Sequence, residues 1–169
     1  MMKIIKKKKD GGYAVLELLF YISFFGVLSL LAINAMITMA RSFKETTIQA
    51  EFVQSGAIME RMSREIKQAY DIDVTSTATD LKLNVKDSAG VSKIVELKLV
   101  SPNIELWDAG ANIGNLNPPN ITVTSLAFTQ ITALEGKSVK IVLSVRSNND
   151  TQARVQDFRN TVVLRGSYK

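Results

Sequence analysis

The chain has 169 residues, with 21 basic and 16 acidic side chains, a formal net charge of +5, and neither cysteine nor histidine. The missing residue types exclude disulfide bonds and most metal sites and nucleophile chemistries. No spacing among the remaining residues indicates catalysis, so we expect no enzyme, no cofactor and no metal site.

The positive charge is concentrated in a short segment at the start of the chain. Residues 1–12 hold five lysines and Asp10, a charge of 5 − 1 = +4, so residues 13–169 carry 5 − 4 = +1. Lysines beside an apolar segment hold that end in the cytoplasm. The nearly neutral remainder lacks the basic excess typical of nucleic-acid-binding domains, so nucleic acid is an unlikely partner.

An apolar segment follows, over residues 13–40, and Glu17 is its one charged residue. Its length predicts a transmembrane helix in a lipid bilayer. A secretory signal peptide would have an apolar core about half as long. A plain membrane anchor would explain neither Glu17 nor Gly12 next to the span. A charge at mid-bilayer costs about 2.5–3.5 kcal/mol, so Glu17 needs a neutralising partner.

Small residues recur at every third position of this segment. Small side chains let helices approach closely in lipid. The row drifts around the helix axis, which favours packing among several neighbouring helices, with Gly26, Ser29 and Ala32 as candidate contacts. The whole row is Ser23, Gly26, Ser29, Ala32, Ala35 and Thr38.

The junction between the two segments resembles the type IV prepilin and type II secretion pseudopilin family. Residues 6–12 read Lys-Lys-Lys-Lys-Asp-Gly-Gly and residues 13–18 read Tyr-Ala-Val-Leu-Glu-Leu. The resemblance implies that prepilin peptidase cuts between Gly12 and Tyr13 and that the new amino group of Tyr13 is methylated. It also implies that Glu17 pairs with the Tyr13 amine of a neighbouring subunit during assembly.

Residues 41–70 predict an amphipathic stalk helix that continues from the span. Its apolar positions recur at helical spacing and would pack on a globular domain. A coiled coil is the alternative use of the stripe, but it would run for only about three heptads. The stripe consists of Ile48, Phe52, Met59, Met62, Ile66 and Ala69, with Ser55 in the remaining place.

From residue 71 the apolar residues alternate instead, which predicts an antiparallel β ectodomain over residues 71–169. The predicted strands lie near residues 81–85, 95–99, 122–129, 139–146 and 162–164. One buried sheet face would pack on the helix stripe, which gives a pilin-like α+β fold.

Residues 101–120 show no period, hold all three prolines and include Trp107, so we expect a long loop there. This loop is either a subunit-contact or tip surface, or a plain connection with Trp107 tucked into the edge of the core. Asp108 and Asn112, like Asp71 and Asp73, lack the spacing of calcium ligands.

Two further segments are similar to the minor pseudopilin J group, namely residues 59–69 and 158–165. Asn34 stands where many major pilins have proline. The expected function is therefore a minor pilin or pseudopilin, a structural subunit that assembles into or primes a type II secretion pseudopilus or type IV pilus.

The family would supply three protein partners: prepilin peptidase, other pilin or pseudopilin subunits, and the inner-membrane assembly platform. It implies a single-pass inner-membrane protein of a prokaryote with a cytoplasmic N-terminus, a periplasmic or extracellular ectodomain, and a filament after processing. The alternative is a filament-tip module of the competence type that binds DNA or another extracellular ligand. Its basic candidates are Lys137, Lys140, Arg146, Arg154, Arg159, Arg165 and Lys169.

Overall fold

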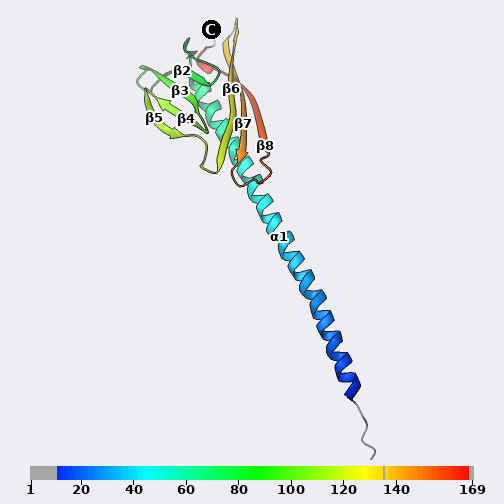
Figure 1. Cartoon of the computed structure of the whole chain (residues 1–169). Helices are drawn as coiled ribbons and strands as arrows, with labels where there is room; N and C mark the ends of the chain where they lie inside the picture. The colour runs from blue at the N-terminus through cyan, green and yellow to red at the C-terminus, as the bar shows by residue number, and fades with distance from the viewer. Residues whose placement is uncertain (1–10, 135, 168–169) are drawn as a thin grey trace, which may run out of the picture. The chain divides into compact units, whose positions relative to one another are not determined.

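A computed structural model describes residues 11–134 and 136–167 of the chain (Figure 1). The chain divides into one unit that ends at Thr46 and a second that begins at Thr47. In the described residues one long helix comes first, followed by eight strands and a short 3₁₀ turn. The elements are α1 (Gly11–Gln68), β1 (Asp71–Ile72), β2 (Asp80–Lys86), β3 (Ser92–Val100), β4 (Asn103–Asp108), β5 (Ala111–Asn115), β6 (Ile121–Ala133), β7 (Gly136–Ser147), β8 (Val155–Val163) and η1 (Arg165–Ser167).

The part of α1 in the first unit exposes its side chains. Over residues 13–46 each side chain is exposed except Ser29, which is half-buried. Over residues 13–40 the helix is apolar around its circumference, with no polar face opposite an apolar one, as expected for a helix surrounded by lipid or by other helices.

The part of α1 in the second unit buries one face, as the apolar stripe predicted. Every predicted stripe position from Ile48 to Ala69 is buried, including Ser55. The hydroxyl of Ser55 donates to the carbonyl of Glu51 at 3.0 Å, so this buried polar group is satisfied within the helix. The chain's own sheets cover the stripe, so it is not free to form a coiled coil.

Two antiparallel sheets supply the rest of the core. The first has the order β1-β2-β3-β4-β5 and the second the order β6-β7-β8. The predicted strands over residues 81–85, 95–99, 122–129 and 139–146 are confirmed, and most of their inward positions are buried. The alternation departs from strict period two in two places: Leu99 is half-buried, and an irregularity between Val123 and Ser125 shifts the register. Together with α1 the two sheets form one hydrophobic core, which confirms the α+β class. Its most enclosed members include Met62, Ile66, Leu81, Leu83, Leu97, Ile104, Ile141 and Leu143.

The loop expected over residues 101–120 is wrong in its central part, which forms β4 and β5. Ile104 and Leu106 are buried and alternate with Glu105 and Trp107. This alternating run is too short to predict a strand from the sequence. β5 has no buried residue, so its sequence carries no alternation that could reveal a strand. Pairing with β3 therefore holds this hairpin in the sheet. The Trp107 indole is half-buried and donates to Glu105 Oε2 at 2.9 Å.

Candidate functional site

The predicted processing junction lies in the first turn of α1. Gly11 is the first helical residue, and Gly12 and Tyr13 follow it in the helix. The Tyr13 side chain is 80% exposed. The lysines expected in the leader precede Gly11 and lie outside the described residues. A helix starting at this glycine pair places Glu17 one turn after Tyr13 on the same helix face.

Glu17 has a hydrogen-bond partner that the sequence reasoning missed. The Tyr21 hydroxyl donates to Glu17 Oε1 at 3.1 Å, from one helical turn further along. The i,i+4 spacing of the two residues was the available signal, since such positions are neighbours on a helix surface. No cation in the described part of the chain lies within ion-pair distance of Glu17. A phenol hydrogen bond lowers the cost of the carboxylate in an apolar medium but does not neutralise it.

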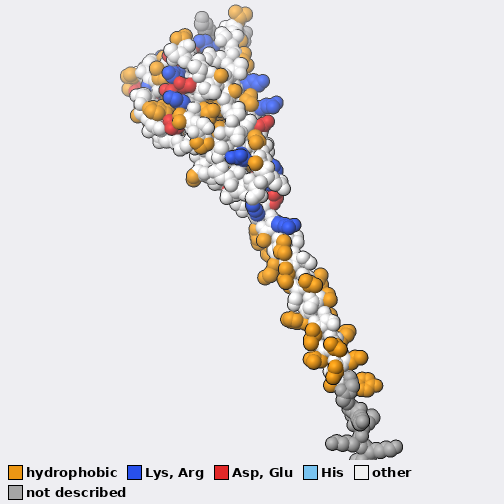
Figure 2. Space-filling model, in the orientation of Figure 1, with side chains coloured by type: hydrophobic (Ala, Val, Ile, Leu, Met, Phe, Trp, Pro, Cys, Tyr) orange, Lys and Arg blue, Asp and Glu red, His pale blue; other side chains and the backbone are white. Residues whose placement is uncertain are grey.

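The surface around Glu17 is apolar, as a helix that crosses a membrane requires. Hydrophobic side chains cover this part of the helix in the view of Figure 2. In the described chain, α1 is the one helix long and apolar enough to cross a membrane, and its most apolar stretch has no buried residue.

The three candidate packing residues lie open on this helix. A methyl group added at Gly26 would meet no other atom within 4 Å. Ala32 is exposed and Ser29 is half-buried. No described side chain covers Gly26, so a close approach there would have to come from another molecule.

The basic residues proposed for DNA contact do not form one free surface. Lys137 is ion-paired with Asp71, and its hydrogen bond holds the pKa of that carboxyl below its usual value. Arg154 Nε donates to Asp150 Oδ2 at 2.9 Å, and this bond lowers the pKa of Asp150 to about 2. Lys169 lies outside the described residues. The predicted basic set therefore loses two of its cations to internal carboxylates.

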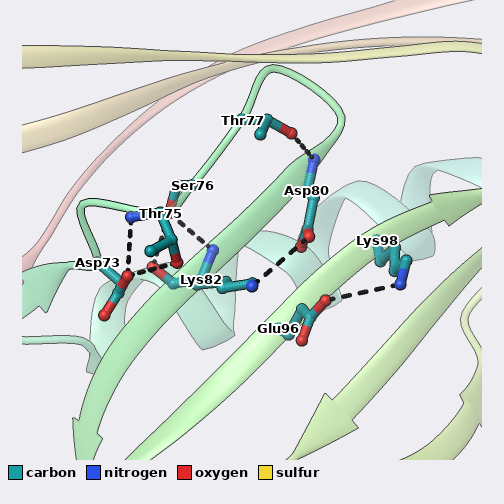
Figure 3. A network of polar contacts seen from close by, with 8 residues as sticks. All are labelled: Asp73, Thr75, Ser76, Thr77, Asp80, Lys82, Glu96 and Lys98. Carbon is teal, nitrogen blue, oxygen red and sulfur yellow. Dashed lines mark hydrogen bonds and ion pairs between the residues drawn. The ribbon is translucent and has the colours of Figure 1, made fainter.

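A polar network lies on β2, on β3 and in the segment before β2 (Figure 3). Asp73 accepts from the Thr75 amide at 2.8 Å and from its hydroxyl at 2.6 Å. Burial and a hydrogen bond with Asp80 raise the pKa of Glu96. The neighbouring Lys82 ammonium lies 4.0 Å from Asp80. The contacts of Asp73 with Thr75, and that of Thr77 with the Asp80 amide, fix the turn before β2.

Two of the acidic residues that lack calcium-ligand spacing are bound by lysines. Asp71 is held by Lys137, and Asp108 accepts from the Lys93 ammonium at 2.7 Å. Within residues 11–134 and 136–167 no three acidic side chains gather as a metal site would require.

No protein-family model, curated protein or solved structure matches this chain. Its function is therefore inferred from the residues themselves, above all from the carboxylate of Glu17.

Proposed function

We propose that this chain is the precursor of a minor pilin or pseudopilin. It would be a structural subunit that assembles into, or primes, a type II secretion pseudopilus or a type IV pilus. The observation that carries the proposal is Glu17, one carboxylate exposed on an apolar helix five residues after Gly12.

The position of this carboxylate suggests which group neutralises it. An unpaired carboxylate is expensive in lipid, and Tyr21 offers it a hydroxyl without a positive charge. Cutting the chain after Gly12 creates an amine at Tyr13, close to the membrane face. In this proposal the amine of one subunit pairs with Glu17 of its neighbour, as the family resemblance implies.

The proposal extends to processing and assembly, as the family resemblance implies. The leader lysines hold the precursor with its N-terminus in the cytoplasm. Prepilin peptidase removes the leader with its net charge of +4 and methylates Tyr13. The freed helix enters the filament through the assembly platform in the inner membrane, and Gly26, Ser29 and Ala32 allow close helix packing. The ectodomain remains on the far side of the membrane.

The first experiment is mass spectrometry of the N-terminus of the chain isolated from its native membranes. The proposal expects a chain that begins at N-methylated Tyr13, and a Gly12→Ala variant that keeps its leader. A wild-type chain carrying its complete leader in those membranes would disprove the processing step.

The second experiment separates assembly from processing. A Glu17→Gln variant is expected to be processed but excluded from filaments, measured by the share of the chain in the sheared filament fraction. Tyr21→Phe is the matched control, because it removes the hydrogen bond to Glu17 and leaves the charge. Incorporation of the Glu17→Gln variant at the wild-type level would refute the pairing with Tyr13.

A further inference from the structure

Four cations converge on a cleft of about 530 Å³ at the end of α1. They are Arg64 and Lys67 from the last turns of the helix, Lys86 from the end of β2, and Arg165 from η1. Gln68 and Val85 complete the lining, so the cleft has no acidic side chain among its lining residues. Sequence reasoning missed this cluster because its members are up to about 100 positions apart.

Little of this charge is neutralised by the protein. Glu60 lies 3.7 Å from Arg64, but both side chains are well exposed, so the pair contributes little. The Lys86 ammonium lies 5.6 Å from the centre of the Tyr70 ring, a contact that leaves its charge in place. In the described residues no carboxylate lies within 4.0 Å of Lys67, Lys86 or Arg165. By contrast, the ammonium groups of other lysines in the same domain are held by aspartates.

The end of a helix attracts cations, but that effect is too small to explain four. The C-terminal dipole is equivalent to about half a negative charge, which one lysine offsets. Lys67 in the last turn of α1 is sufficient for this purpose. Lys86 and Arg165 come from other elements and add two further charges to the same cleft.

Main-chain contacts hold the three contributing segments together. The Gly166 amide donates to the Ala69 carbonyl at 3.3 Å, and the Tyr70 amide donates to the Asn84 carbonyl at 3.0 Å. A Cβ atom at Gly166 would lie 2.6 Å from the Cα of Tyr70, so only glycine permits this close approach. Arg165 is thereby fixed beside the end of α1.

We propose that this cleft binds a ligand through two or more phosphate groups. Guanidinium groups match phosphate oxygens bidentately, and ammonium groups add strong point charges. The volume lies within the range of small-ligand sites, roughly 300–1,000 Å³. The phosphate groups can belong to a soluble polyphosphate or to a nucleic-acid backbone, which present the same chemistry. The site does not depend on processing or on filament assembly.

The test is titration of the full chain, in a zwitterionic detergent, with tripolyphosphate. A Lys86→Gln/Arg165→Gln variant removes two cations from the cleft. The matched control is Lys140→Gln/Arg159→Gln, which removes two exposed cations from β7 and β8. The control and the cleft variant therefore have the same net charge. Trp107 fluorescence verifies that both variants fold.

The cleft variant is expected to bind tripolyphosphate about tenfold or more weakly than wild type, because it loses charge-assisted hydrogen bonds. The control is expected to bind within about twofold of wild type. Equal losses in the two variants would mean that net charge alone, leader included, attracts the anion, and the proposal would be overturned. Unchanged affinity of the cleft variant would overturn it as well.

A second titration, with a single-stranded oligonucleotide, identifies the source of the phosphates. If the natural ligand is a nucleic-acid backbone, the logarithm of affinity falls less steeply with the logarithm of salt concentration in the cleft variant. The slope should decrease by about 0.7 for each phosphate that the variant no longer neutralises. If the cleft variant loses affinity for tripolyphosphate and keeps the wild-type slope for the oligonucleotide, the ligand is a soluble polyphosphate. Both outcomes support the phosphate site.

Discussion

Substitution of Glu51 by glutamine tests how α1 is fixed to the second sheet. Glu51 is 6% exposed and lies on the helix face that packs on the domain. Its carboxylate accepts hydrogen bonds from the Ser147 hydroxyl and, at 2.5 Å, from Asn149 Nδ2. Burial alone would raise the pKa of Glu51, but these bonds and a third from Asn120 together hold the pKa below its usual value.

The magnitude follows from the number of donors. A hydrogen bond to a charged group contributes about 1.5–3 kcal/mol, and glutamine has one acceptor oxygen for donors that arrive from Ser147, Asn149 and Asn120. At least one hydrogen bond to a charged acceptor is therefore lost. The NH₂ group of the glutamine, which is itself a donor, would also face another donor. We therefore expect Glu51→Gln to reduce the free energy of unfolding by about 2–4 kcal/mol at neutral pH.

The assay is urea unfolding of the full chain in detergent, followed by fluorescence of Trp107, the single tryptophan of the sequence. Glu60→Gln is the control, because Glu60 is an exposed glutamate of the same helix whose pair with Arg64 contributes little. A loss below about 0.5 kcal/mol for Glu51→Gln would refute the reasoning.

The same substitution has a pH signature. The pKa of Glu51 is depressed in the folded state, so its stabilisation is complete above the usual value of 4.5 and is lost as the pH falls through the folded-state pKa. The difference between wild type and Glu51→Gln should therefore shrink at acid pH. A difference that stays constant from pH 7 to pH 3 would show that the lost stability does not come from the carboxylate.

Three further predictions use the same unfolding assay. Gly166→Ala should destabilise the domain by about 1–3 kcal/mol, because its methyl group would overlap the backbone of Tyr70, whereas wild-type stability would show that this turn yields freely. Gly56→Ala should stabilise by about 0.5–1 kcal/mol, because nothing lies within 4 Å of the new methyl group and alanine favours the helix; a loss would indicate an unrecognised contact. Asp150 accepts from Arg154 and has a folded pKa of about 2, so its contribution is present above the unfolded value near 3.8 and lost as the pH falls toward 2. Asp150→Asn should therefore flatten the acid loss of stability between pH 4 and 2, and an unchanged profile would contradict the assignment.

Local pattern was sufficient to predict much of this fold. The apolar stripe from Ile48 to Ala69 repeats at helical spacing, and the alternation over residues 139–146 repeats at strand spacing. The buried face of each segment can therefore be predicted from the segment's own sequence. Glu17 was equally visible, because a single charge in a long apolar run needs no tertiary information to be noticed. The role assigned to Glu17 remains a prediction from that position and from the family resemblance.

Long-range contacts decided the rest. β5 has no buried residue and exists because β4 offers it hydrogen-bonding groups. The bond from Ser147 to Glu51 joins residues 96 positions apart, and the cleft that holds Arg165 depends on a close approach of Gly166 to Tyr70. A periodic sequence records which face of a segment avoids water, because that preference belongs to the segment alone. The sequence pattern does not indicate which polar groups from distant segments contact each other, because those contacts depend on how the sheets pack on the helix.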